Sequence, residues 1–264
     1  MSNFFQQQQP RYSAFPPVVK NLLIANIIAF IATYILKNQN IDLVDLFGLH
    51  YFESPKFKVY QIITSMFLHG GFMHIALNMY GLWMFGQMIE NYYGAKKFLI
   101  LYFVAGIGAS IIQEASLWMY FHHVQDAISV FNTSPTINNF NFIVSKYFSG
   151  LTGYPAPQTT EETKSILATL YQYIVDSSVT IGASGALFGV LVAFGVIYSE
   201  VQLFIMFIPI PIKAKYAIIG YVVIELFSGL SNSTGDTVAH FAHLGGALFG
   251  FILVMYWRKK GRIY

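Results

Sequence analysis

The chain has 264 residues, of which 55% are hydrophobic and only 10% are charged, and its formal net charge is +3. A soluble globular domain carries about 25% charged residues, so this composition excludes an ordinary soluble fold and favours a membrane protein. The small net charge gives no indication of nucleic-acid binding, and the absence of cysteine excludes disulfides and thiol chemistry.

Six apolar segments predict membrane-spanning helices, because a helix needs about 20 mostly apolar residues to cross a bilayer. The second segment is the least apolar and the fifth contains a glutamate, Glu225. We therefore expect an all-α membrane protein with a six-transmembrane-helix bundle. The predicted spans, in chain order, are 18–36, 67–89, 97–118, 179–198, 214–230 and 238–257.

Lysine and arginine residues favour the cytoplasmic side of a membrane, and their distribution predicts the orientation of the chain. With six spans, ten of these residues fall on the side of the two termini and five on the other side. Residues 1–17 and the basic tail 258–264 are therefore expected to be cytoplasmic. The short N-terminal tail and the lack of an organelle signal favour a bacterial inner membrane.

Two long connections are expected on the outer side. In the first, "IDLVDLFGLHYF" has helix-like apolar spacing and is expected to lie along the membrane interface. The second, residues 121–178, contains the turn or coil signals "NTSPTINNFNF" and "GYPAPQ". An amphipathic helix is predicted near 160–176, where Thr159 and Glu162 form a capping box. On the cytoplasmic side, "VQLFIMFIPIP" is too short to span and predicts an interfacial turn.

Polar side chains in three separate spans lie at one depth. The second, fourth and sixth spans run from outside to inside, and each carries polar groups in its first half, within about 16 Å of its start at 1.5 Å per residue. Polar side chains inside a membrane are costly, so this convergence indicates a functional site. The residues concerned are His74, Asn78, Ser184, His240 and His243.

These residue types suit nucleophilic catalysis. A serine hydroxyl such as that of Ser184 becomes a good nucleophile only when a base takes its proton. His243 suits that role, because the pKa of an imidazole lies near working pH. Attack on a carbonyl creates an oxyanion, for which His74, Asn78 and the backbone N–H of Ser184 are candidate donors. His74 and Asn78 are four residues apart and share one helix face.

Small residues flank the candidate nucleophile and base. Glycines let helices and a substrate backbone approach closely, and glycines four apart favour tight packing of membrane helices. Packing of the fourth span on the sixth would bring Ser184 within reach of His243. The glycines expected to permit this packing are Gly182, Gly185, Gly246 and Gly250.

Three motifs in this order resemble the rhomboid family of intramembrane serine proteases. They are "HGGFMHIALN" at 69–78, "GASG" at 182–185 and "AHLGGALFG" at 242–250. "GQMIENYYG", which contains Glu90, is similar to a loop motif of the family. The resemblance covers the six-span core, residues 18–257.

The resemblance implies a rhomboid-like bundle with a Ser184–His243 dyad rather than a triad. His74 and Asn78 would line the oxyanion hole, and His69 would be structural. It implies cleavage of single-span membrane protein substrates near the outer boundary of the lipid bilayer, with no metal and no organic cofactor. The sequence does not indicate an oligomeric state.

The sequence departs from the family pattern at two places. A Trp-Arg pair is frequent in the first outer loop of the family, whereas Tyr60 and Gln61 stand here. The outer loop 121–178 is longer than in the simplest members, and substrate recognition, a lid and a spacer all remain open as its role.

Less specific interpretations stand beside the protease hypothesis. Taken alone, Ser184 could bond to its own helix backbone, as serines in spans often do. Glu225 is expected to be a buried, hydrogen-bonded carboxyl rather than a catalytic group, and His240 to be structural or in contact with water. Two rival functions are a non-enzymatic family member that binds membrane clients and a metal-ion carrier lined by His69, His74, His240 and His243.

Overall fold

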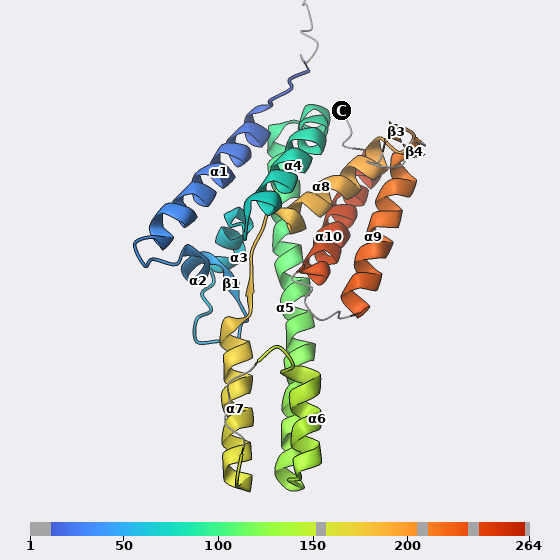
Figure 1. Ribbon diagram of the computed structural model, residues 1–264. Helices are drawn as coiled ribbons and strands as arrows, with labels where there is room; N and C mark the ends of the chain where they lie inside the picture. Colours follow the sequence, from blue (N-terminus) through green and yellow to red (C-terminus); the bar gives the residue numbers. More distant parts are fainter. Residues whose placement is uncertain (1–11, 152–156, 205–210, 232–237, 262–264) are drawn as a thin grey trace, which may run out of the picture.

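The computed structural model describes residues 12–151, 157–204, 211–231 and 238–261 (Figure 1). These residues form an all-α bundle with two small two-stranded antiparallel sheets. The helices are α1 (Pro17–Lys37), α2 (Leu43–Phe47), α3 (Gln61–Thr64), η1 (Ser65–Phe67), α4 (Phe72–Tyr93), α5 (Ala95–Thr133), α6 (Ile137–Tyr147), α7 (Thr160–Ser177), α8 (Ser184–Ile197), α9 (Ala214–Ser231) and α10 (His240–Lys259). The strands are β1 (Leu49–His50), β2 (Val179–Thr180), β3 (Gln202–Leu203) and β4 (Ile212–Lys213).

The membrane bundle contains a helix in each of the six predicted spans. Within the described residues, four helices are long and apolar enough to cross a membrane: α1, α5, α9 and α10. The α3–η1 segment and α4 form a pair bent by 95°, which gives a fifth span if the pair counts as one. Helix α8 is apolar but has only 14 residues, or about 21 Å at 1.5 Å per residue. The chain is therefore an integral membrane protein.

The prediction that the fourth span is helical from residue 179 is wrong. Val179 and Thr180 form β2, which pairs with β1 at Leu49 and His50. Gly182 then has a φ of +127°, in the region that favours glycine, so the chain cannot continue as a helix through it. Ser184 is consequently the first residue of α8 rather than the sixth residue of a longer helix.

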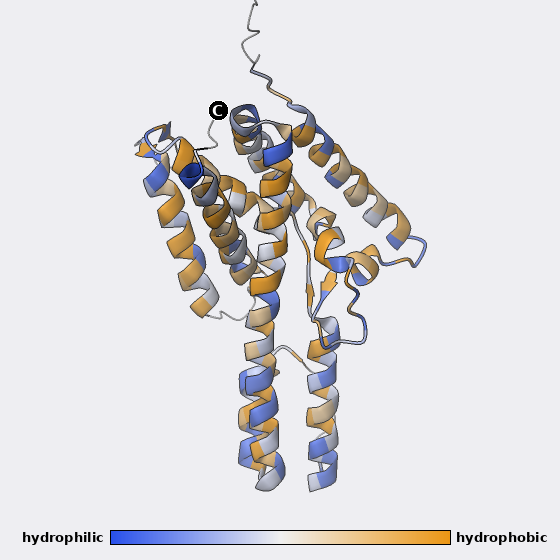
Figure 2. Cartoon of the chain, turned by 180° about the vertical axis from the view of Figure 1, so that it is seen from behind, coloured by the Kyte–Doolittle hydropathy of each residue, from blue (hydrophilic) through white to orange (hydrophobic). Residues whose placement is uncertain are grey.

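Helix α5 runs far beyond the predicted end of the third span at residue 118. It has 39 residues and extends to Thr133, so it is about 58 Å long. Its final turns, α6 and α7 form a lobe that projects from one end of the bundle (Figure 1), and we call it the outer lobe after the side of the membrane predicted for it. Figure 2 shows more hydrophilic residues on this lobe than on the bundle. The lobe has its own apolar core, which includes Val124, Phe131, Phe140 and Leu167.

Most of the predicted coil in the outer loop is helix. The motif "NTSPTINNFNF" contains the start of α6, because Thr136 caps that helix by accepting a hydrogen bond from the backbone N–H of Asn139. The predicted helix near 160–176 is confirmed as α7, and the capping box of Thr159 and Glu162 is present. Part of "GYPAPQ", residues 153–156, lies outside the described residues.

The described residues before α1 are bound to α4. The backbone of Ser13 exchanges two hydrogen bonds with the side chain of Asn91 at the end of α4. The indole N–H of Trp83 donates to the carbonyl of Ala14 at 3.2 Å. These contacts hold the residues before α1 against α4. Helix α1 begins and α10 ends at the same end of the bundle, as an even number of spans requires (Figure 1).

The first outer loop contains only a short helix where a longer interfacial helix was expected. Hydrogen bonds of the Gln61 side chain connect parts of this loop. Only Leu43–Phe47 are helical within "IDLVDLFGLHYF", since Gly48 ends α2 and β1 follows. The Gln61 side chain accepts from the backbone N–H of Lys58 at 2.9 Å and donates to the carbonyl of Leu46 at 3.3 Å. A single buried amide therefore bridges the two ends of the loop.

The predicted turn between α8 and α9 is a hairpin in the residues described there. β3 pairs antiparallel with β4, and residues 205–210 between them lie outside the described part of the chain. Glu200 forms ion pairs with Lys213 and Lys215, and these hydrogen bonds lower the pKa of its carboxyl to about 2. The hairpin thus carries charge at the end of the bundle where α1 begins and α10 ends (Figure 1).

Glu90 fixes the start of α1. Its two carboxylate oxygens accept hydrogen bonds from the backbone N–H groups of Val18 and Val19, at 2.9 and 2.8 Å. The first N–H groups of a helix have no partner within the helix, so an acceptor here satisfies donors that would otherwise be buried and unpaired. Glu90 is only 3% exposed.

Replacing Glu90 with alanine is expected to destabilise the fold by about 2–4 kcal/mol, because one buried and one partly buried donor then lose their acceptor. Thermal unfolding of the detergent-solubilised protein measures this. Glu161→Ala is the control, since that side chain is 83% exposed and forms only a surface ion pair. Equal unfolding temperatures for Glu90→Ala and Glu161→Ala would contradict the capping role.

Candidate active site

The structure brings Ser184 and His243 into direct contact. Ser184 begins α8 and His243 lies in the first turn of α10. The distance between Ser184 Oγ and His243 Nε2 is 2.8 Å, which is a hydrogen bond. The close approach that the sequence predicted for this pair is therefore present. His243 is 7% exposed, so the contact is largely shielded from solvent.

Glycines make this contact possible by letting α8 pack directly on α10. A Cβ added to Gly246 would lie 1.8 Å from the carbonyl oxygen of Gly185. One added to Gly250 would lie 2.5 Å from the Cα of Gly189, a glycine that the sequence argument did not single out. A Cβ on Gly185 would meet Ala109 of α5 at 2.4 Å. Backbone therefore packs on backbone at the site.

Gly182 has a different role from the helix packing predicted for it. It lies before α8, and its N–H donates to the carbonyl of Ser65 at 2.9 Å. A Cβ at this position would lie 2.8 Å from His74 Nε2 and 3.6 Å from Ser184 Oγ. The absence of a side chain at Gly182 thus leaves space next to both His74 Nε2 and Ser184 Oγ.

The three donors predicted for an oxyanion differ in the hydrogen bonds that they already form. The Gly70 N–H donates to His74 Nδ1 at 3.3 Å, so the proton of the neutral ring lies on Nε2, the nitrogen beside Gly182. The Asn78 amide donates one hydrogen to the carbonyl of His74 at 2.9 Å, and its second hydrogen can serve another acceptor. The Ser184 N–H lies in the first turn of α8, where helical partners are lacking.

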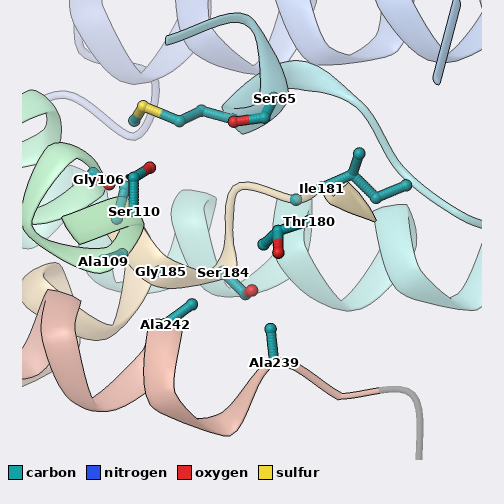
Figure 3. Close-up of a pocket in the computed structure, with 13 residues that line it drawn as sticks. Ser65, Gly106, Ala109, Ser110, Thr180, Ile181, Ser184, Gly185, Ala239 and Ala242 are labelled. Atoms are coloured by element: carbon teal, nitrogen blue, oxygen red, sulfur yellow. Dashed lines mark hydrogen bonds between the residues drawn. The ribbon is translucent and has the colours of Figure 1, made fainter. Parts of the chain in front are cut away.

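A small cavity adjoins the serine. Figure 3 shows Ser184 with Ala239 and Ala242 at the start of α10 on one side and Thr180 and Ile181 on the other. The volume of this cavity is about 30 Å³. That is room for a water molecule, which a hydrolytic reaction consumes.

Phe188 supports the histidine ring and was not singled out from the sequence. Its ring stacks on that of His243 with 4.3 Å between centroids and 10° between planes. Phe188 lies four residues after Ser184, so both side chains are on one face of α8. That spacing is the signal in the sequence that could have identified it.

Glu225 reaches the same site from α9. It is 5% exposed and hydrogen-bonded, as expected from the sequence, but its partners link it to the candidate base. Its Oε2 lies 2.8 Å from His243 Nδ1 and 2.6 Å from His240 Nδ1. His240 therefore has a structural contact, and the site contains a continuous chain from Ser184 through His243 to Glu225.

The histidines do not form one metal cluster in the described part of the chain. His69 and His74 contact each other, with 5.0 Å between ring centroids. His240 and His243 instead share Glu225, and these three are the described residues grouped closely enough to hold an ion. The four histidines proposed to line a metal-ion carrier thus lie as two pairs, each with its own contacts.

Comparison with known proteins identifies relatives across most of the chain. The Rhomboid domain family matches residues 56–122 and 163–260, so the match leaves out the final turns of α5 and all of α6. The chain is 28% identical over 251 residues to RHOMBOID-like protein 12, mitochondrial, of Arabidopsis thaliana, covering 93% of this chain and 59% of that protein. It is 29% identical over 199 residues to Rhomboid protein 1, mitochondrial, of Saccharomyces cerevisiae, covering 75% and 42%.

A bacterial relative matches over a shorter stretch. The chain is 40% identical over 52 residues to Rhomboid protease GluP of Bacillus subtilis, covering 20% of this chain and 10% of that protein. The chain spans at most 59% of the length of these three relatives. Each of these relatives therefore contains regions to which this chain has no matching segment.

Proposed function

Because the chain belongs to the rhomboid family, we propose that it is an intramembrane serine endopeptidase that uses a nucleophilic Ser184 and a basic His243. The observation that carries this proposal is the 2.8 Å hydrogen bond between Ser184 Oγ and His243 Nε2. Supporting features are the stacked Phe188, the adjoining cavity and the donors around Ser184. A relative named as a protease is consistent with this activity.

The reaction follows from the arrangement of these atoms. Ser184 Oγ attacks the scissile carbonyl carbon, its proton passes to His243 Nε2, and a bond between oxygen and carbon forms. His74 Nε2–H, the second Asn78 amide hydrogen and the Ser184 N–H are the proposed donors to the oxyanion. His243 then gives the proton to the leaving nitrogen, the C–N bond breaks, and water hydrolyses the acyl-enzyme by the reverse proton path.

The proposed substrates are single-span membrane proteins cleaved near the outer boundary of the bilayer. Ser184 is the first residue of α8, at the end of that helix nearer the outer lobe (Figure 1), and the apolar helices α5, α9 and α10 pack against α8. The named relatives that match most of this chain are mitochondrial, and they give no support to the bacterial inner membrane expected from the sequence.

Covalent labelling tests the proposal directly. A fluorophosphonate probe is expected to label the detergent-solubilised wild type, to leave Ser184→Ala unlabelled, and to label Ser145→Ala like the wild type. Ser145 is an exposed serine of α6 whose hydroxyl donates to a backbone carbonyl. Cleavage of a single-span test substrate by the same three proteins should follow the labelling. A folded wild type that neither reacts nor cleaves would favour the non-enzymatic, client-binding member.

A further inference from the structure

We propose that Glu225 is a positioning residue for His243, which gives the site a Ser–His–Glu arrangement in place of the dyad implied by the family resemblance. This inference rests on the proposed function. Glu225 and Ala214 are the buried residues in the described part of α9, whose other side chains are less buried. A carboxylate therefore turns inward from a largely exposed helix, and its Oε2 lies 2.8 Å from His243 Nδ1.

The tautomer of His243 determines whether it can act as a base. A neutral imidazole carries one hydrogen, and Nε2 must be free of it to accept the proton of Ser184. The hydrogen must then lie on Nδ1, where it needs an acceptor. An ionised carboxylate only accepts hydrogen bonds, so Glu225 stabilises the reactive tautomer and disfavours the inactive one.

Glu225 also stabilises the charge that appears during the reaction. When Nε2 takes the proton from Ser184, His243 becomes an imidazolium, and the carboxylate beside Nδ1 offsets this charge in a site shielded from water. His240 supplies a second hydrogen bond to the same oxygen, at 2.6 Å. Two donors on one carboxylate help to offset the cost of burying its charge.

The distances favour hydrogen bonds over a shared metal ion. A tetrahedral zinc site with ligand distances of about 2.1 Å separates its ligand atoms by about 3.4 Å. Glu225 Oε2 is closer than this to both Nδ1 atoms, at 2.6 and 2.8 Å. A metal on Nδ1 would also displace the hydrogen that the reactive tautomer of His243 requires.

Glu225→Gln is the most informative variant, because it keeps the size of the side chain and removes its charge. Its amide can present N–H groups to Nδ1, which favours the inactive tautomer of His243. We expect kcat for the single-span test substrate to fall by about 10²-fold or more, with KM within about threefold of the wild type. Thermal unfolding of the same samples should be unchanged within about 2 °C.

The controls separate the possible outcomes. Leu226→Ala, a 43% exposed neighbour on α9, is expected to leave kcat unchanged. A Glu225→Gln variant that unfolds earlier yet keeps its kcat would overturn the positioning role and leave a structural one. Loss of wild-type activity with EDTA, restored by Zn²⁺, would also overturn it. If the wild type itself is neither labelled nor active, the proposed function fails instead.

Discussion

Replacing His243 with alanine is expected to lower kcat/KM for a single-span substrate by at least about 10³-fold, since the group that accepts the Ser184 proton is removed. The His243 ring is held by a hydrogen bond on each nitrogen and by the stacked ring of Phe188. No other described side chain is hydrogen-bonded to Ser184 Oγ, so none is placed to replace it. Single-turnover cleavage in detergent or liposomes measures the loss.

His123→Ala provides the matched control for this experiment. His123 is an exposed histidine in the outer part of α5, far along the chain from the site. Its replacement is expected to leave kcat/KM within about twofold of the wild type, because exposed substitutions rarely change function or stability. A folded His243→Ala protein that retained a tenth or more of wild-type activity would refute the assignment of the base.

Gly246→Ala is expected to have the largest effect on stability, about 3 kcal/mol or more. Its new methyl group would lie 1.8 Å from the carbonyl oxygen of Gly185, so one helix must move. Backbone atoms cannot rotate out of the way as a side chain can. Separation of α8 from α10 would also lengthen the Ser184–His243 contact, so activity should fall together with the unfolding temperature.

Gly220→Ala makes the same chemical change at an open position. Nothing lies within 4 Å of a Cβ added to this residue of α9. Alanine favours a helix over glycine by about 1 kcal/mol, so this variant should be as stable as the wild type or more stable. If the two variants unfolded at one temperature, close packing of α8 on α10 would not be what Gly246 provides.

The apolar segments predicted the bundle well because hydropathy reports directly on burial in lipid. Hydropathy did not predict the start of α8, since Val179 and Thr180 continue the apolar segment in the sequence yet form a strand paired with the first outer loop. The extension of α5 and helix α6 were missed for the opposite reason, although α7 was predicted. Helix α5 continues past residue 118 by packing on α6 and α7, and such contacts leave only a weak pattern in the sequence.

Matching depth in three predicted helices, together with the glycines of the fourth and sixth spans, predicted that Ser184 and His243 lie close together. Depth alone does not give the rotation of a helix about its axis, and rotation decides which side chains point inward. The partner of Glu225 was therefore not predictable, because α9 has few buried residues to mark its inner face. The position of Gly182 outside α8 likewise depends on a local backbone angle of +127°.

The short length of α8 sets how deep the nucleophile lies. A typical hydrocarbon core is about 30 Å thick, and 14 helical residues cover about 21 Å of it. If the far end of α8 meets one surface of the core, Ser184 lies about 9 Å below the other surface. The extended residues that complete the crossing cannot be left facing lipid, because their backbone groups need partners. Because Ser184 is the first residue of α8, the proposed nucleophile can lie inside the bilayer and still be close to one of its surfaces.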